Sequence, residues 1–581
     1  MTDPKPRKEC DLVMEGGITS GVVYPAAVAK LHEEYDFRSI GGTSAGAIAA
    51  AATAAAQYRW NGDGGRVPDP FAELRDLTDE LGRDGNLVKL FQPSFGLRAP
   101  FAVFLAGLEA SRARRGGGWR VGRAMVKTVL REAPRASAAG AIAGAALVGT
   151  LVCAVGGGPT PAAWTLGAAT AGMGAVAAAT MALVRVLLRS IPENDFGIST
   201  GHSIDPSTPA LTDWLTDKLD HLAGLSDAEK PLTFGHLDAR GVELRMVTTN
   251  LTQRRPEVLP FEQRAWIFNA DELGRFFPKR VIDRLVEHAF VARWTLPAGF
   301  YFLPEAADLP VILAVRMSLS FPLLVSTIPL YRLDETRLPR RRADVRSLTS
   351  RDLVRSVFSD GGICSNFPIH FFDRWFPTRP TFGISLGAAG PDAAADAARV
   401  HLPRPNQPER PRSEAISGVA SFLTSIVVTA KDHRDILQRE LPSYRERVAQ
   451  IALRGDEGGL NLDMPASTIE TLRKLGQQAG DRLLDFDFDE HRWVRLRVLL
   501  PRLAEEVEAL HALLGEDFDP YDLPWTRADG SPLPYPRPEK WREEAQTFLR
   551  AMASAAGTLT KERARSREPR PPLALRATPR S

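Results

Sequence analysis

The sequence predicts an α/β fold in which helices cover both faces of a sheet, a three-layer α/β/α arrangement. Short apolar runs typical of buried strands alternate along the chain with longer helical segments. Two of the early strands run directly into glycine-rich turns that open helices. The chain has 581 residues, of which 44% are hydrophobic and 25% charged. These fractions are close to globular averages, and the length leaves room for more than one domain.

The first predicted strand, residues 11–14, leads into a glycine-rich turn, Glu15-Gly16-Gly17-Ile18-Thr19-Ser20-Gly21, and a helix is expected from Val22. Such a turn directs backbone N–H groups toward one spot and can bind an anion. The phosphate-binding patterns G-x-x-x-x-G-K-[ST] and G-x-G-x-x-G are both absent here. An oxyanion hole is therefore favoured over a phosphate cradle, with a glycine turn needed only for packing as the alternative.

The second predicted strand, residues 37–40, ends in the sequence Gly42-Thr43-Ser44-Ala45-Gly46. This G-x-S-x-G pattern is typical of a nucleophile elbow, in which a serine sits on a sharp turn between a strand and a helix. The flanking glycines allow the tight turn, and the alanine-rich run that follows is a strong helix former. Ser44 is therefore the candidate nucleophile.

A third segment lies far downstream, where a predicted strand at 356–360 ends in Asp360-Gly361-Gly362. An aspartate at a strand end can orient or deprotonate a serine hydroxyl, although it can equally form an Asx turn. A conventional triad would need a histidine, and His370 follows Asp360 in the order seen in α/β-hydrolases. Because the elbow follows only the second strand, we favour a Ser–Asp dyad with a carboxylate base and keep the His370 triad as an alternative.

Together, the glycine-rich loop, the elbow and the Asp360 turn resemble the signatures of patatin-like phospholipases, which are lipid acyl hydrolases with a Ser–Asp dyad. A further segment, Ala314-Val315-Arg316-Met317-Ser318-Leu319-Ser320-Phe321-Pro322, is similar to a helix that packs near the active site in this family. The resemblance covers about residues 10–110 and 195–390.

By this resemblance, Ser44 is the nucleophile, Asp360 is the base, and the backbone amides of Gly16, Gly17 and Ile18 form the oxyanion hole. It also implies a phospholipid or other acyl-lipid substrate and a reaction that needs no metal and no cofactor. The remaining glycines of the motifs support these turns: Gly21, Gly42, Gly46, Gly361 and Gly362.

One departure from the family pattern concerns the glycine-rich loop, which is usually G-G-G-x-[KR]-G. Here Ile18 replaces the third glycine and Ser20 replaces the basic residue. A lysine or arginine at that place would help to hold anionic headgroups. The sequence therefore supports a lipid acyl hydrolase first, and a catalytically impaired, membrane-associated binding or scaffold protein as the alternative.

Between the motifs lies an insertion, residues 111–194, in which a basic stretch precedes two uncharged segments at 137–157 and 162–184. Each uncharged segment is long enough to cross a bilayer, and the turn between them predicts a helical hairpin. Gly140 and Gly144 would let the helices approach closely. Because alanine and glycine contribute little apolar area, a hairpin buried in a soluble protein is the alternative. The flanking cations are Arg112, Arg114, Arg115, Arg120, Arg123, Lys127, Arg131, Arg135, Arg185 and Arg189.

Cations on both flanks of the hairpin predict that both ends lie on the cytoplasmic side of a membrane. The N-terminus has no apolar secretory segment, and three widely spaced cysteines indicate neither a disulfide framework nor a zinc site. A net charge of +3 gives no sign of a nucleic-acid partner. The oligomeric state is not predicted. The expected organisation is a catalytic domain at 1–110 and 195–390, the insertion at 111–194, a linker at 391–413, a mostly helical region at 414–556 and a disordered basic tail at 557–581.

Overall fold

The computed structural model describes residues 7–17, 19–63, 68–82, 86–112, 117–154, 160–334 and 347–389, with short gaps at 204, 206, 226–229, 264 and 293. It also describes residues 399–404, 441–514 with gaps at 455–456, 459–460 and 462–463, residues 539–556, and a few single or paired positions elsewhere. The predicted tail, 557–581, and most of the predicted linker, 391–413, lie outside the described residues.

The described residues form a main sheet of eleven strands in the order β12-β13-β11-β1-β2-β4-β10-β9-β6-β7, with β5 also paired to β4. Its central strands are parallel: β1 (Lys8–Met14), β2 (Tyr35–Gly42), β4 (Glu243–Asn250), β11 (Thr381–Ala388) and β13 (Val448–Leu453). The strands joined to them by antiparallel pairing are β5 (Arg255–Leu259), β6 (Ile267–Asn269), β7 (Phe300–Phe302), β9 (Ile328–Leu333), β10 (Leu353–Asp360) and β12 (Val400–His401). A small parallel pair lies apart: β3 (Gly197–Ser199) and β8 (Leu323–Val325).

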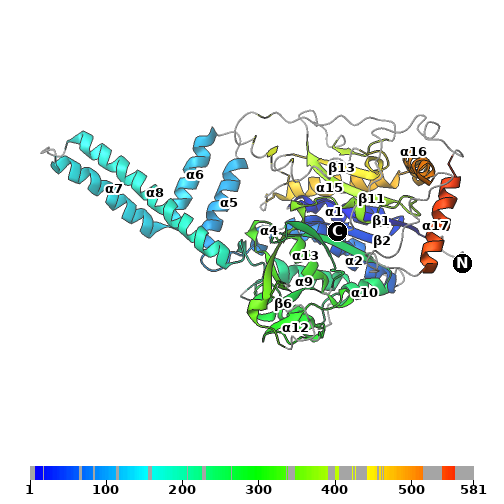
Figure 1. Cartoon of the computed structure of the whole chain (residues 1–581). Coiled ribbons are helices and arrows are strands. Elements are labelled where there is room, and N and C mark those ends of the chain that lie inside the picture. The colour runs from blue at the N-terminus through cyan, green and yellow to red at the C-terminus, as the bar shows by residue number, and fades with distance from the viewer. Residues whose placement is uncertain are drawn as a thin grey trace.

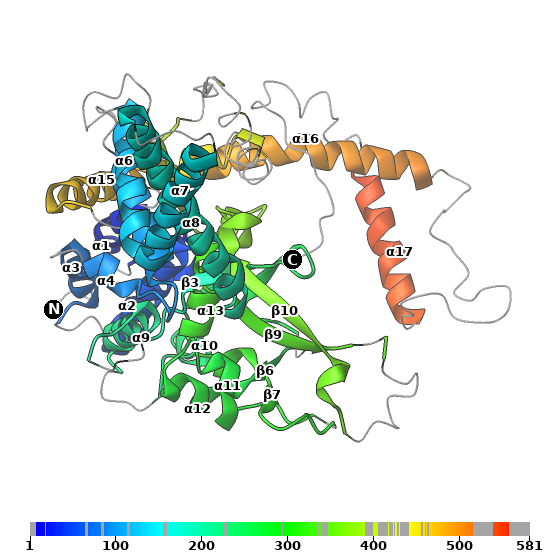
Figure 2. The same ribbon diagram turned by 90° about the vertical axis from the view of Figure 1, so that its left-hand side faces the viewer.

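Helices lie on both sides of this mixed sheet, which confirms the predicted three-layer α/β/α fold (Figures 1 and 2). The side chains of β1 explain why both faces are covered. Successive residues of a strand point to opposite faces of the sheet, and here both faces carry apolar side chains. Leu12 and Met14 belong to the large core cluster under the helices of one face. Val13 belongs to a smaller cluster with Phe367 and Phe372 on the other face.

The large core cluster is built with α1 (Tyr24–His32), α2 (Ala45–Asp63), α3 (Pro70–Gly82), α9 (Leu211–Leu222), α13 (Val311–Ser318) and α15 (Ala466–Leu484). The remaining α-helices are α4 (Asn86–Leu90), α5 (Arg98–Arg112), α6 (Gly117–Glu132), α7 (Pro134–Ala154), α8 (Pro161–Glu193), α10 (Phe234–Ala239), α11 (Ala270–Leu273), α12 (Lys279–Glu287), α16 (Phe488–Leu514) and α17 (Glu539–Ser554). Short 3-10 helices include η1 (Ser20–Val23), η2 (Ala306–Asp308), η4 (Ser350–Asp352), η5 (Gly361–Ile363), η6 (Ile369–Phe371) and η8 (Arg445–Arg447).

The C-terminal region differs from the mostly helical layer that the sequence predicts for 414–556. Helices α15, α16 and α17 are present, but β13 pairs with β11 inside the main sheet. The sheet therefore extends beyond residue 390, where the catalytic domain was expected to end. The strand is only Val448–Leu453, and such a short apolar run cannot be distinguished from a helix segment by periodicity.

The insertion leaves the body of the protein as a long helical hairpin of α7 and α8, with α5 and α6 beside its base (Figure 1). Thr160 caps α8 by accepting a hydrogen bond from the Ala163 amide at 3.2 Å. The chain departs and returns at one point, because the Ser94 amide donates to the Ile198 carbonyl at 2.9 Å. The hairpin is thus attached to the body through the neighbourhood of β3.

Glycines bring the two hairpin helices into direct backbone contact. A Cβ atom on Gly140 would overlap the carbonyl oxygen of Gly174, and one on Gly144 would overlap that of Thr170. The Thr170 hydroxyl also donates to the Gly144 carbonyl at 3.0 Å. The close approach predicted for Gly140 and Gly144 is therefore confirmed.

Apolar side chains cover the outside of the hairpin. Ile142 is 71% exposed, Trp164 72% and Leu188 73%. Among the described residues, α8 is the one helix long and apolar enough to cross a membrane by length and composition, and only 11% of its apolar window is buried. The alternative of a hairpin buried within a soluble body does not describe this structure.

Candidate active site

The elbow at Ser44 has the backbone geometry that its sequence pattern requires. The serine lies between the end of β2 and the start of α2, with a φ of 54°, in the left-handed region. A Cβ atom on Gly42 would overlap the Gly46 carbonyl, and one on Gly46 would overlap the carbonyl of Met14 in β1. Both glycines are therefore needed for the turn to close against the sheet.

A serine from another helix holds the nucleophile candidate in place. The Ser44 amide donates a hydrogen bond at 3.0 Å to the hydroxyl oxygen of Ser318, the last residue of α13. Ser44 is 3% exposed and Ser318 is fully buried. The elbow is thus fixed from both sides, by the sheet beneath it and by α13 above it.

Asp360 lies at the same edge of the sheet, although the strand that carries it runs in the opposite direction. It ends β10, which is antiparallel to β4, and it stands opposite Thr248. On the other side of β4, Gly42 stands opposite Met246, two residues before Thr248. Ser44 and Asp360 therefore flank the same end of β4.

The Ser318 hydroxyl also links the two candidates. A Cβ atom on Gly361 would lie 3.3 Å from the Ser318 oxygen and would overlap the Val247 carbonyl. Since the same oxygen accepts from the Ser44 amide, α13 contacts both the elbow and the turn after Asp360. The absence of a side chain at Gly361 allows this three-way packing.

The Asp360 carboxylate is oriented by its own turn. One carboxylate oxygen, Oδ1, accepts a hydrogen bond from the Gly362 amide at 2.8 Å, which is the Asx turn that the sequence left as an alternative explanation. The Asp360 amide donates to the Ser320 carbonyl at 2.9 Å, and so does the Ser359 hydroxyl. The segment after α13 thus anchors the end of β10.

The glycine-rich loop requires a correction to the predicted oxyanion hole. The Gly16 amide is engaged, because it donates to the Asn366 carbonyl at 2.8 Å. The Thr43 hydroxyl donates to that same carbonyl at 2.7 Å. Gly16 therefore serves to clasp the loop to the segment after Asp360, and it does not offer its N–H to a ligand in this arrangement.

The remaining loop positions stay as predicted donors. Gly17 accepts, through its carbonyl, a hydrogen bond from the Ala45 amide at 3.2 Å, which ties the loop to the elbow. Gly21 packs against Ala45, since a Cβ atom there would lie 2.9 Å from the Ala45 Cβ. Ile18, the third predicted donor, lies outside the described residues.

Two residues near the loop carried no sequence signal. Asn366 donates through its side chain to a Glu15 carboxylate oxygen at 3.0 Å, and a Cβ atom on Gly362 would lie 2.7 Å from the Asn366 amide oxygen. Glu15 also accepts from the Leu386 amide of β11 at 2.7 Å. Since these bonds join residues far apart in the chain, only a three-dimensional arrangement reveals them.

Arg316, in the helix that the resemblance identified, is a fully buried cation. Its guanidinium donates to the Thr200 carbonyl at 2.9 Å, the Ser326 carbonyl at 2.8 Å and the Ser320 hydroxyl at 2.8 Å. Burial lowers the pKa of Arg316 to about 9. This arginine ties α13, and with it Ser318, to the strands at the base of the hairpin.

Comparisons with known proteins agree with the motifs. A family model described as patatin-like phospholipase matches residues 12–107, which include the glycine-rich loop and the elbow. The RpoH suppressor of Rhizobium meliloti (strain 1021) is 36% identical over 562 residues, covering 86% of this chain and 86% of that protein.

Solved structures with lower similarity include VipD from Legionella pneumophila, with 14% identity, a TM-score of 0.28 and coverage of 96% of this chain and 85% of that one. The ExoU–SpcU complex of the Pseudomonas aeruginosa type III secretion system has 13% identity, a TM-score of 0.25 and coverage of 88% and 65%. The family model, together with the elbow geometry, gives the assignment: the chain belongs to the patatin-like phospholipase family.

Proposed function

We propose that the protein is a serine lipid acyl hydrolase, which cleaves carboxylic esters of phospholipids or other acyl lipids with a Ser44–Asp360 dyad. The observation that carries the proposal is that the strained Ser44 turn and Asp360 flank the same end of β4, with Ser318 in contact with both segments. Membership of the patatin-like phospholipase family supports ester hydrolysis as the reaction class.

In the proposed reaction, the Ser44 hydroxyl oxygen attacks the ester carbonyl while Asp360 accepts the hydroxyl proton. The tetrahedral intermediate collapses, and the alcohol leaves with the proton from Asp360, so that an acyl ester of Ser44 remains. Water then attacks this ester with Asp360 again as base, which releases the fatty acid and restores the serine. The amides of Gly17 and Ile18 are the proposed donors to the oxyanion.

We further propose that the α7–α8 hairpin attaches the enzyme to the cytoplasmic face of a membrane. Its exposed apolar surface and the length of α8 support insertion into hydrocarbon. The cations beside it, such as Arg185 and Arg189, favour an anionic leaflet. The enzyme would then reach its lipid substrate while the lipid stays in the membrane.

The alternative, a catalytically impaired scaffold, has two observations in its favour. Both the Gly16 and the Ala45 amides donate to backbone carbonyls within the site, and the family's basic loop residue is replaced by Ser20. If this arrangement is permanent, the oxyanion loses these two amides as donors and the hydrolysis is slow. Reactivity of Ser44 distinguishes the two functions.

A fluorophosphonate probe tests the proposed nucleophile on the full-length protein. We expect labelling of the wild type and of Ser356→Ala, a buried serine in β10, and no labelling of Ser44→Ala. Asp360→Asn should lower ester hydrolysis by roughly 10²–10⁴-fold, the usual contribution of a general base. His370→Ala should retain activity, and its loss would instead favour a triad. An unlabelled Ser44 in the wild type would favour the scaffold.

The membrane proposal has its own test in vesicle flotation. Replacing Ile142, Trp164 and Leu188 by aspartate should move the protein out of the vesicle fraction, because each charge would enter the hydrocarbon. The matched control replaces Trp375 and Phe376, which are exposed but lie outside the hairpin. Equal flotation of both variants would contradict the anchor.

A further inference from the structure

An apolar channel starts beside the elbow and runs along α2. The cavity has a volume of about 110 Å³. Its first residues, Thr19, Gly21 and Ala45, come from the glycine-rich loop and from the position next to Ser44. The wall continues along Ala49, Ala52 and Thr53 of α2, and Leu215, Lys218 and Leu222 of α9 line it as well.

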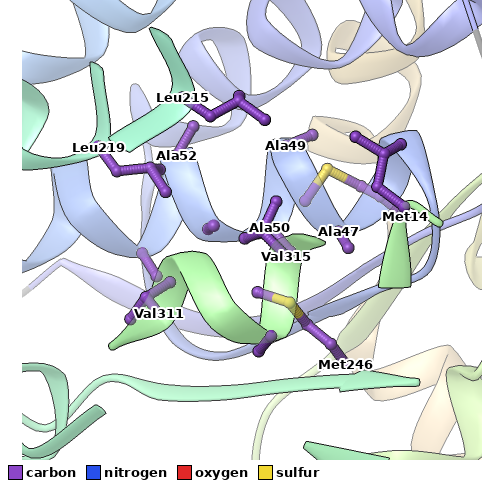
Figure 3. Packing of buried hydrophobic residues seen from close by; sticks show 14 of the residues in the cluster. Met14, Ala47, Ala49, Ala50, Ala52, Leu215, Leu219, Met246, Val311 and Val315 are labelled. Atoms are coloured by element: carbon purple, nitrogen blue, oxygen red, sulfur yellow. The ribbon is translucent and has the colours of Figure 1, made fainter. Parts of the chain in front are cut away.

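The channel exists because α2 presents small side chains to α9. Figure 3 shows Leu215 and Leu219 of α9 lying over Ala49 and Ala52 of α2. Alanine at these positions leaves a gap that a larger side chain would fill. Thr53 adds no free polar group to the wall, because its hydroxyl donates to the Ala49 carbonyl at 2.7 Å.

The charged residue of the channel lies at its rim and is neutralised. The Lys218 ammonium is 2.6 Å from a Glu80 carboxylate oxygen, and the Trp214 indole nitrogen donates to Glu80 at 3.3 Å. The apolar stems of Lys218 and Trp214 therefore face the channel while their polar ends point to Glu80. Such a lining excludes a phosphate headgroup and suits hydrocarbon.

The dimensions fit one alkyl chain. From Ala45 to Thr53 the helix rises about 12 Å at 1.5 Å per residue. A cavity of about 110 Å³ is too small to hold two alkyl chains of this length side by side. An extended alkyl chain advances about 1.3 Å per carbon, given a carbon–carbon bond of about 1.5 Å, so the channel accommodates roughly ten carbons.

We infer that this channel binds the single linear acyl chain of the ester whose carbonyl is attacked by Ser44, with the methyl end toward Leu222. The inference rests on the proposed function, since it assigns the chain that the dyad releases. Ala49 and Ala52 set the width of the channel, and they are therefore the specificity-determining residues for acyl length and shape.

Binding can be measured without catalysis in the Ser44→Ala protein, using decanoic acid brominated near its methyl end. We expect saturable quenching of Trp214 fluorescence, lost in Trp214→Phe and kept in Trp375→Phe, which removes an exposed tryptophan outside the channel. Quenching that is the same in all three proteins would show that the acid binds elsewhere, and it would overturn the inference.

Specificity is tested by the ratio of kcat/KM for decanoyl and butyryl p-nitrophenyl esters. Ala52→Leu should lower this ratio by roughly 15–60-fold, because two to three methylenes are displaced and each contributes about 0.8 kcal/mol, or fourfold. Leu222→Ala should shift the optimum toward longer chains. Asp217→Leu, on the exposed side of α9, is the matched control and should leave the ratio unchanged.

The two proposals fail in different ways. An unchanged ratio in Ala52→Leu, in a protein that the fluorophosphonate probe still labels at Ser44, overturns the channel and leaves the hydrolase intact. A protein that neither hydrolyses the esters nor reacts with the probe overturns the hydrolase, while Trp214 quenching still reports whether an alkyl chain occupies the channel.

Discussion

The hydroxyl oxygen of Ser318 accepts a hydrogen bond from the backbone amide of Ser44 at 3.0 Å. The amide of the candidate nucleophile is thus satisfied by a side chain that lies far away in the sequence. Because that oxygen also lies next to Gly361, one hydroxyl fixes the spacing between the elbow and the Asp360 turn.

Ser318→Ala should therefore slow the reaction of Ser44 with the fluorophosphonate probe, while the protein keeps its fold. Leaving the buried Ser44 amide without its acceptor costs about 1–3 kcal/mol, seen as a lower midpoint in urea unfolding. The rate of fluorophosphonate labelling should fall as well. Ser356→Ala, another buried serine, is the control and should label at the wild-type rate; an equal slowing in both variants would contradict the positioning role.

Arg316→Met should destabilise the protein strongly. The substitution leaves the buried Ser326 carbonyl and the half-buried Thr200 carbonyl without their donor, at a cost of about 2 kcal/mol in the free energy of unfolding. Lys279→Met removes an exposed cation paired with Asp283 and should change stability by less than about 1 kcal/mol. Chemical denaturation measures both variants, and similar losses would show that burial of Arg316 is unimportant.

Gly140→Val should separate the hairpin helices. A side chain there overlaps the Gly174 carbonyl and approaches the Ala178 Cβ within 2.6 Å, whereas Gly172 has nothing within 4 Å of an added Cβ. Hydrogen exchange across α7 and α8 should accelerate at least tenfold in Gly140→Val. Gly172→Val carries the same change in helix propensity and should remain close to wild type. Equal acceleration in both variants would mean that helix propensity, and not packing between the helices, sets the exchange rates.

Asp220 should give the stability a distinctive pH dependence. Burial raises the pKa of this carboxyl to about 6, although the Leu232 amide and Arg280 both favour the charged form. The folded state therefore holds this proton more tightly than the unfolded chain. Its contribution to stability is complete below about pH 4 and is lost as the pH rises through 6.

Asp220→Asn, which mimics the protonated form, should remove this dependence. Relative to wild type, the variant should gain up to about 3 kcal/mol in unfolding free energy between pH 4 and pH 7. Asp217→Asn, on the exposed side of the same helix, should show no such gain. Urea unfolding at several pH values measures this gain. A difference between variant and wild type that stays constant across this range would show that the pKa of Asp220 is not raised.

The local parts of the site could be predicted from the sequence. The elbow is written in five consecutive residues, since only glycines at 42 and 46 avoid overlap with the backbone. The Asp360 turn is equally local, because Gly362 supplies its amide to the carboxylate two residues earlier. Such short patterns can be recognised in the sequence without knowledge of the fold.

Contacts between distant segments could not be predicted in this way. The Gly16 amide was expected to face a ligand, but the carbonyl that engages it belongs to Asn366. The direction of β10 relative to β4 also depends on pairing that no single segment encodes. The apolar channel arises between α2 and α9, and neither helix shows it alone.

The hydrogen bond between Ser94 and Ile198 has a consequence for the evolution of the chain. A segment whose two ends already touch can be lengthened, exchanged or removed without opening the framework that it leaves. The projecting α7–α8 hairpin can therefore change in length while the main sheet and the residues of the candidate site keep their places.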